Sequence, residues 1–356
     1  MKLDALIRDP IFQLNLLLWM ALDQPDQVAR VKPLFYRWGY RFLMVEAPLP
    51  LPPSLVQVAE KSGLDISLAP EPEMVLGNPA NHRALYLEAK KESFSAGSST
   101  ARQARGHLLA AGPAFRDIVS PYHGARLCYV LPEDRRSLME ACLAELKAEL
   151  TAHALGAADT SLHGLAAGPQ GVDYIWDDAF AAYVGADSRR EQVLPTAGEE
   201  TDPTPLLLVY SAEDYAGGAT PDYAREAMLK QVWAWLLCEV QVAETGVPLA
   251  FKTDTLLTLT TGGIFNFLGK ERQRNLCRLV KEQLFKPISA HWNEAETKRD
   301  DIEVALNGGV LSINLRDELA KAHFTDWLED GKKLRPDFSA LPKEEPLAFD
   351  FDREVP

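Results

Sequence analysis

The sequence has few cysteines and no long uninterrupted hydrophobic run. Its 356 residues include four cysteines, Cys128, Cys142, Cys238 and Cys277, and none of them forms a Cys-x-x-Cys pair. This spacing supports neither a disulfide framework nor a zinc ribbon. The longest apolar run near the start, residues 11–22, is interrupted by Gln13 and Asn15 and is shorter than the roughly 20 residues that cross a bilayer. Asp4 and Asp9 stand where a signal peptide would carry positive charge, so we expect a cytoplasmic protein with no membrane association.

Positive charge is also in deficit. The chain has 37 Lys and Arg residues against 51 Asp and Glu residues, a formal net charge of −14. This balance excludes a protein that binds nucleic acid over its whole surface, because phosphate contacts need Lys and Arg. Any such contact must use a local basic patch. Residues 81–126 offer one, with seven Lys or Arg residues against three Asp or Glu residues.

The rest of the composition is typical of a globular protein, with 47% hydrophobic and 25% charged residues. At about 100–200 residues per domain, the length favours two domains. Residues 187–205 are rich in charge and contain three prolines, which predicts a linker. An N-terminal domain then covers 1–186, and a C-terminal α/β domain of unknown role covers 206–330. Residues 331–356 are acidic and proline-rich and are expected to form a tail.

Hydrophobic periodicity predicts a mixed α/β order of helices and strands. Helices are predicted within 11–40, where there are two, and at 54–61, 100–111, 135–155, 223–242, 270–284 and 317–328. Strands are predicted at 41–45, 65–68, 73–76, 84–90, 126–131, 206–210 and 253–260. A hairpin is predicted from 301–306 and 310–315, because the intervening Asn-Gly-Gly supplies the positive φ angles that tight turns require.

Two acidic residues and a lysine fall on neighbouring predicted strands. Side chains alternate along a strand, so Glu88 and Lys90 project to one side while Leu87 and Ala89 face the core. Glu73 lies on the preceding predicted strand, which can pair with the strand of Glu88. Two converging carboxylates bind a hard cation such as Mg²⁺. Lys90 would then hold a metal-activated water or the developing charge, which predicts a site for phosphodiester hydrolysis.

Pro72-Glu73, Glu88-Ala89-Lys90 and the downstream Gln103 together resemble the motif of the PD-(D/E)XK, or restriction-endonuclease-like, nuclease superfamily. The resemblance covers roughly residues 54–131 and implies a mixed central sheet flanked by helices. It implies that Glu73, Glu88 and the backbone carbonyl of Ala89 hold Mg²⁺ or Mn²⁺. It also implies that Lys90 positions the attacking water and that Gln103 lies near the site on the following helix.

Two departures from that motif leave alternatives open. The first acid is glutamate where aspartate is commoner, so Asp65 or Glu71 could hold the metal in place of Glu73. The family motif also has tyrosine four residues after the glutamine, where this chain has His107, which we interpret as a surface histidine rather than a ligand of substrate phosphate. Lys91, Arg102 and Arg105 are the candidate nucleic-acid contacts of the basic patch.

The resemblance implies a metal-dependent endonuclease acting on nucleic acid, DNA in the first place, in bacterial restriction or anti-phage defence. Cleavage of both strands would favour a homodimer, and the C-terminal domain could bind protein partners. The alternative is a non-catalytic member of the same fold that serves as a scaffold or regulatory subunit in a multi-protein complex. The acidic balance and the altered glutamine motif favour this alternative.

Overall fold

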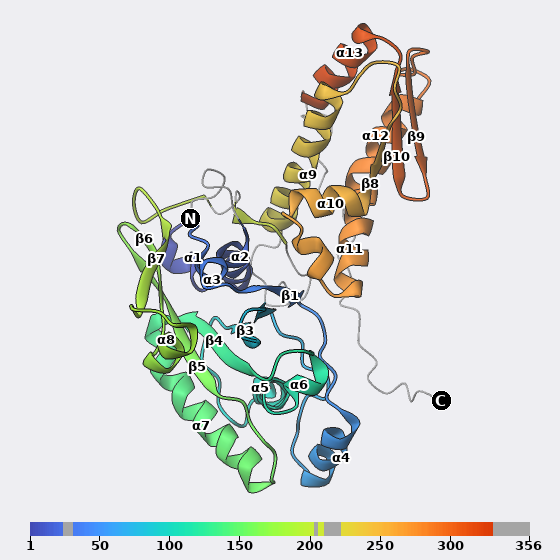
Figure 1. Ribbon diagram of the computed structural model, residues 1–356. Coiled ribbons are helices and arrows are strands. Elements are labelled where there is room, and N and C mark those ends of the chain that lie inside the picture. Colours follow the sequence, from blue (N-terminus) through green and yellow to red (C-terminus); the bar gives the residue numbers. More distant parts are fainter. Residues whose placement is uncertain (24–30, 203–205, 210–221, 330–356) are drawn as a thin grey trace. The chain divides into compact units, whose positions relative to one another are not determined.

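The computed structural model in Figure 1 describes residues 1–23, 31–202, 206–209 and 222–329. The chain divides into two compact units. The first contains Met1–Val209 and Thr261–Arg274, and the second contains Tyr210–Thr260 and Asn275–Pro356. Within the described ranges, no helix is both long enough and apolar enough to cross a membrane. The tail predicted at 331–356 lies outside the described residues.

Seven strands of the first unit form one sheet, in the same order in space as in sequence. They are β1 (Arg41–Val45), β2 (Met74–Asn78), β3 (Arg83–Ala89), β4 (Ala125–Pro132), β5 (Thr160–Gly168), β6 (Gly171–Ile175) and β7 (Arg190–Pro195). Strands β3, β4 and β5 run parallel to one another, and the remaining neighbours are antiparallel. The prediction of a mixed sheet flanked by helices is confirmed.

Helices cover both faces of this sheet, with α1 to α3 on one side and α5 to α7 on the other (Figure 1). Their bounds are α1 (Leu3–Leu6), α2 (Pro10–Ala21), α3 (Leu34–Arg37), α4 (Pro53–Ser62), α5 (Ser99–Ala110), α6 (Phe115–Ile118), α7 (Arg136–Ala152) and α8 (Asp178–Val184), with 3₁₀ turns η1 (Glu133–Arg135) and η4 (Ile264–Phe267). Capping residues in the sequence mark the N-termini of two of these helices. Asp9 accepts a hydrogen bond from the backbone N–H of Ile11 (2.9 Å) at the start of α2, and Ser98 accepts one from Ala101 (3.3 Å) at the start of α5.

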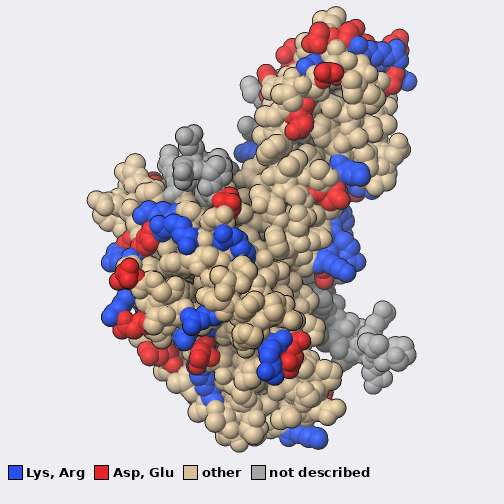
Figure 2. All heavy atoms as spheres, in the orientation of Figure 1, with Lys and Arg blue, Asp and Glu red and all other residues tan. Residues whose placement is uncertain are grey.

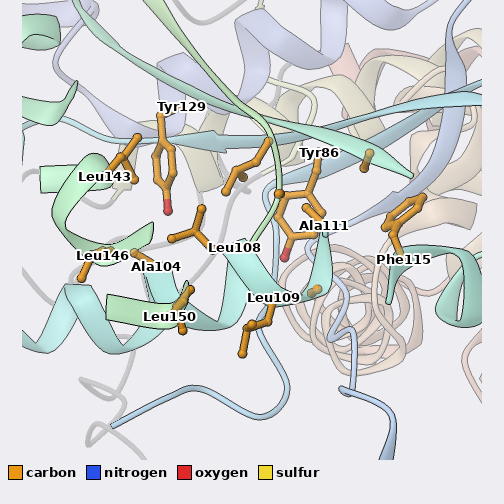
Figure 3. Close-up of a cluster of buried hydrophobic side chains, with 14 of the residues drawn as sticks. Tyr86, Ala104, Leu108, Leu109, Ala111, Phe115, Tyr129, Leu143, Leu146 and Leu150 are labelled. Atoms are coloured by element: carbon orange, nitrogen blue, oxygen red, sulfur yellow. The ribbon is translucent and has the colours of Figure 1, made fainter. Parts of the chain in front are cut away.

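The connections β3–α5–β4 and β4–α7–β5 place two helices against one face of the parallel strands. In Figure 3, Tyr86 of β3 and Tyr129 of β4 point from the sheet toward these helices. Leu108 of α5 and Leu146 of α7 meet them, and all four side chains are fully buried. Glu88 follows Tyr86 at i+2, so it lies on this same helix-covered face of the sheet.

Three sequence predictions in the first unit are wrong, and the backbone hydrogen bonds of each segment explain why. Residues 65–68 form no strand, since the N–H of Ser67 donates to the backbone oxygen of Arg102 in α5 (3.1 Å). The described part of 206–210 forms no strand either, because its backbone bonds to Asn15. Residues 190–195 of the predicted linker are β7, which pairs with β6 and buries Val193.

Asn15 is fully buried in α2 and fixes the end of this part of the chain. Its Oδ1 accepts hydrogen bonds from the N–H groups of Leu208 (2.6 Å) and Val209 (3.0 Å), and its Nδ2 donates to the carbonyl of Val209 (2.8 Å). A side-chain amide therefore takes the place of a neighbouring strand for these two residues.

The first unit is completed by residues 261–274, which return to it after the chain has passed through part of the second unit. Leu268 forms a parallel bridge with Val45 at the end of β1, and the N–H of Gly269 donates to the carbonyl of Val45 (3.2 Å). A side chain at position 269 would collide with the backbone, because its Cβ would lie 2.6 Å from the carbonyl oxygen of Glu46. Glycine is thus required for this close approach.

The second unit combines helices with a small antiparallel sheet in the order β8–β10–β9. Its elements are α9 (Asp222–Val242), β8 (Leu249–Lys252), α10 (Thr253–Thr260), the π-helical turn η5 (Lys281–Phe285), α12 (Lys286–Asn293), β9 (Ile302–Asn307), β10 (Val310–Leu315) and α13 (Glu318–Glu329), and it shares α11 (Lys270–Val280) with the first unit. The predicted hairpin is confirmed. Gly308 and Gly309 form its two-residue turn with φ angles of 57° and 92°.

The strand predicted at 253–260 is instead the helix α10. Its threonines favour a strand, but the buried residues Leu256, Leu257 and Thr260 are spaced for one helical face. The hydroxyl of Thr260 donates to the backbone oxygen of Leu256 (2.9 Å), a bond that a helix provides for a β-branched alcohol. Burial of one helical face therefore overrides the local strand preference.

Candidate functional site

The candidate motif lies at one end of the β2–β3 pair. Glu73 comes directly before β2, Glu88 lies in β3 and Lys90 follows its last residue. The pairing of Met74 with Leu87 carries over to the next residues, where the N–H of Glu73 donates to Oε2 of Glu88 (3.4 Å). Strand register thus brings the two acidic residues of the motif to opposite positions.

Glu88 and Lys90 form a direct ion pair. The Nζ of Lys90 donates to Oε1 of Glu88 at 2.5 Å, as the spacing of the two residues on one strand predicts. However, the expectation that only the face of Leu87 and Ala89 is buried is wrong. Every residue from Ala84 to Ala89 is buried, so both faces of β3 are covered and Glu88 is only 3% exposed.

His107 was expected at the surface and is instead buried beside Glu88. It is 2% exposed, and its Nε2 lies 3.5 Å from Oε1 of Glu88. Its Nδ1 hydrogen-bonds to the hydroxyl of Tyr86 at 2.6 Å. The sequence held a signal for this position, because His107 lies at i+3 from Ala104 and next to Leu108 on the apolar face of α5.

The ionisation of this cluster depends on its ammonium group. Burial raises the pKa of Glu88, whereas His107 and Lys90 lower it, and the lowering prevails. Burial lowers the pKa of His107 more than the Glu88 carboxylate raises it. Because a neutral imidazole contributes no net charge, we attribute the ionised state of Glu88 at neutral pH to Lys90.

The alternative metal acids are each engaged by an arginine. Asp65 lies 3.2 Å from the Nε of Arg102, and both side chains are largely exposed. Glu71 lies 3.7 Å from the guanidinium of Arg272 in α11. The same guanidinium lies 3.4 Å from Oε1 of Glu46.

Glu46 is a residue that sequence reasoning missed. It follows β1 in the left-handed backbone region, with a φ angle of 41°, and it is 5% exposed. Its N–H donates to the carbonyl of Glu73 (3.1 Å), so it lies beside the start of β2. Its position directly after a predicted strand was the available signal. Its contact with Arg272 joins positions more than two hundred residues apart, which no local pattern can reveal.

The predicted nucleic-acid contacts differ in their surroundings. Lys91 and Arg102 are exposed, and so is Gln103, which lies on α5 one turn before His107. The guanidinium of Arg105 instead donates to Oε2 of Glu149 (2.8 Å) and to the backbone oxygens of Ala96 and Asp65. Arg105 therefore fastens α5 to α7 and to the preceding loop.

On the face shown in Figure 2, Lys and Arg side chains alternate with Asp and Glu and form no continuous basic surface. Across the described residues, no group of three or more His, Cys, Asp or Glu side chains is arranged to hold a metal ion. The motif itself contains the carboxylates of Glu73 and Glu88 and the carbonyl of Ala89, and oxygen donors of this kind are those that Mg²⁺ prefers.

Fold and site together define a mixed α/β protein in which a buried carboxylate pairs with a partly buried ammonium at the end of strand β3 of its central sheet. Comparison of the chain with protein-family models, with curated proteins and with solved structures gave no match.

Proposed function

We propose that this chain is a divalent-metal-dependent nuclease that hydrolyses phosphodiester bonds, with DNA as its first candidate substrate. The observation that carries the proposal is the 2.5 Å contact between Lys90 and Glu88, opposite the backbone of Glu73. A buried carboxylate is costly to maintain in its charged form, because its charge must leave water, and the partly buried ammonium of Lys90 offsets part of that cost. Such a pair is therefore a candidate for chemistry rather than for stability alone.

The residues of the motif have distinct roles in this proposal. Glu73, Glu88 and the carbonyl of Ala89 would hold Mg²⁺ or Mn²⁺, which when bound polarises a phosphoryl oxygen and lowers the pKa of a bound water. Lys90 would hold the attacking water, and Gln103 would face the substrate. Exposed Lys91 and Arg102 would contact phosphates. Arg105 has the weakest support among the proposed contacts, since its guanidinium already has three protein acceptors.

The resemblance to the PD-(D/E)XK superfamily supports the same proposal at the level of arrangement. An acid precedes β2, an acid-x-lysine ends the neighbouring β3, and a helix carrying Gln103 follows. By that analogy, bacterial restriction or anti-phage defence is the proposed setting. Cutting both strands of a duplex would favour a homodimer, and the second unit is the candidate surface for protein partners.

A second candidate function has its own observation. Glu88 is 3% exposed, its Oε1 faces both Lys90 and His107, and its Oε2 receives the N–H of Glu73. A carboxylate whose two oxygens already have protein partners can serve, together with Lys90, as a structural ion pair. The second candidate is therefore a non-catalytic scaffold or regulatory subunit of the same fold.

A cleavage assay separates the two candidates. Supercoiled plasmid, linear duplex, single-stranded DNA and RNA are each incubated with the native chain and Mg²⁺ or Mn²⁺. Glu88→Gln and Lys90→Gln are the test variants, and Glu92→Gln and Lys61→Gln are matched controls at exposed positions. The nuclease proposal expects metal-dependent cutting that both test variants lose and both controls keep. Cutting that survives in folded Glu88→Gln would refute this site, and no cutting of any substrate would favour the scaffold.

A further inference from the structure

Three buried side chains form a line on the helix-covered face of β3. The hydroxyl of Tyr86 lies 2.6 Å from Nδ1 of His107, and Nε2 of His107 lies 3.5 Å from Oε1 of Glu88. Their exposed fractions are 0%, 2% and 3%. Tyr86 and Glu88 stand at i and i+2 on one strand, and His107 reaches them from α5. Only Glu88 of the three belongs to the metal motif.

The donors and acceptors along this line fix the state of the imidazole. A carboxylate can only accept hydrogen bonds, so the Nε2 that faces Glu88 must carry a proton. In a neutral imidazole the other nitrogen is then an acceptor, and the Tyr86 hydroxyl is its donor. Tyr86 therefore selects the ring tautomer that turns an N–H toward Glu88. At 3.5 Å this N–H makes an electrostatic contact with Oε1 rather than a short hydrogen bond.

The two oxygens of Glu88 consequently differ. Oε1 faces two N–H donors, the ammonium of Lys90 and the imidazole of His107. Oε2 receives the backbone N–H of Glu73 at 3.4 Å. Rotation of the carboxylate would break the two contacts of Oε1 and the longer contact of Oε2, so these contacts together hold the plane of the carboxylate.

We infer that His107, held by Tyr86, is a positioning residue that orients the Glu88 carboxylate so that Oε2 is the oxygen offered to the metal. This inference rests on the proposed function, and it adds two residues to the site. Groups that hydrogen-bond to metal ligands commonly change metal affinity or activity by 10–100-fold when they are replaced. His107 would act on the ion through Glu88, and Tyr86 would act through His107.

The same sheet contains a matched control. His163 of β5 pairs through Nδ1 with the hydroxyl of Tyr174 of β6, and both are fully buried. The Nε2 of His163 has no hydrogen-bond partner among the described residues. Loss of either tyrosine hydroxyl removes one buried hydrogen bond, but only Tyr86 is connected to a candidate metal ligand.

Isothermal titration with Mn²⁺ on the full chain tests the inference. We expect Tyr86→Phe to raise the Kd for Mn²⁺ about tenfold or more, and Tyr174→Phe to change it less than about twofold. His107→Leu should weaken Mn²⁺ binding further. His107→Gln should recover part of the affinity, because its amide can place a donor near the position of Nε2. Histidine ¹⁵N spectra at constant pH should show His107 protonated on Nε2 in the native chain and a changed tautomer balance in Tyr86→Phe.

The outcomes separate this inference from the proposed function. If the native chain binds Mn²⁺ and Tyr86→Phe and His107→Leu bind it as well as Tyr174→Phe does, the positioning role is wrong and the metal site stands. If the native chain does not bind Mn²⁺, both the metal site and the positioning role are wrong. His107 protonated on Nδ1 in the native chain would also overturn the inference.

Discussion

The central sheet holds two buried histidine–tyrosine pairs whose difference lies in what the second imidazole nitrogen faces. In one, Nε2 of His107 faces Oε1 of the Glu88 carboxylate, and the Nζ of Lys90 donates to the same oxygen. In the other, Nε2 of His163 has no hydrogen-bond partner among the described residues, and the ring packs against Phe180 with a centroid distance of 4.2 Å. The comparison teaches that burial of a histidine alone does not indicate chemistry. The neighbouring charge distinguishes a candidate site from core packing.

The largest effect should follow from removing the charge that distinguishes the first pair. Lys90→Met leaves the buried carboxylate of Glu88 without its ammonium and should lower the free energy of unfolding by about 3–5 kcal/mol. Urea denaturation measures this change. The exposed neighbour Lys91→Met should stay within about 0.5 kcal/mol. The double variant Glu88→Gln/Lys90→Met should recover much of the loss, and a double variant as unstable as Lys90→Met would mean that charge is not the cause.

The pH dependence of stability should be steeper for the second pair. Burial, followed by Arg136 and Arg126, lowers the pKa of His163 well below its ordinary value of 6.5. The unfolded chain therefore binds a proton that the folded chain does not, so the free energy of unfolding falls as pH drops below about 6.5. The fall is at most about 1.4 kcal/mol per pH unit for this one group. His163→Phe should flatten the curve, as read from urea midpoints across this pH range.

His107 sharpens this pH comparison. Its pKa is also lowered by burial, but the Glu88 carboxylate opposes the shift, so the sign is the same and the effect is smaller. His107→Gln should remove less of the pH slope than His163→Phe does. An equal loss of slope would show that the carboxylate does not separate the two environments.

The stability of the two tyrosine variants should be nearly the same. Tyr86→Phe and Tyr174→Phe each remove one buried hydrogen bond and should each cost about 1–3 kcal/mol, because a buried imidazole nitrogen loses its hydrogen-bond partner. Thermal or urea unfolding of both variants measures this. If Tyr86→Phe were much more destabilising, weakened Mn²⁺ binding in that variant would reflect damaged folding instead of lost orientation.

The smallest effect on stability is expected for the exposed ion pair beside the site. Arg102 and Asp65 have exposed side chains, so Arg102→Ala should change the free energy of unfolding by less than about 1 kcal/mol. Its effect on DNA should be separable from stability. If Arg102 contacts a phosphate, the slope of log affinity against log salt should shrink by about one in this variant. An unchanged slope would remove Arg102 from the proposed contacts.

Local patterns predicted the strands and helices that carry the candidate site. Alternation along 84–90 placed Glu88 beside Lys90, and the apolar spacing of 135–155 predicted α7. The wrong strand at 253–260 shows the limit of propensity, since Thr and Leu there bury a helical face. A strand inside the charged segment 187–205 was missed because β6 supplies its hydrogen bonds and Val193 its burial.

The parts of the site that escaped prediction depend on contacts between distant segments. His107 was expected at the surface because it lies four residues after Gln103, on the same side of the helix, yet its side chain is buried and contacts Tyr86 and Glu88 of β3. Glu46 meets Arg272 only because residues 261–274 return to the first unit. Such contacts are set by tertiary packing, whereas the pairing of Glu88 with Lys90 is set by a single strand.

The return of residues 261–274 to the first unit has a practical consequence for dividing the protein into fragments. A chain cut after Val209 would keep all seven strands and the whole Glu88 cluster, but it would lose the guanidinium that faces Glu46 and the backbone bond that Gly269 gives to the end of β1. Glu46 would lose its contact with the guanidinium of Arg272. A fragment designed on strand content alone would thus lack two contacts next to the candidate site.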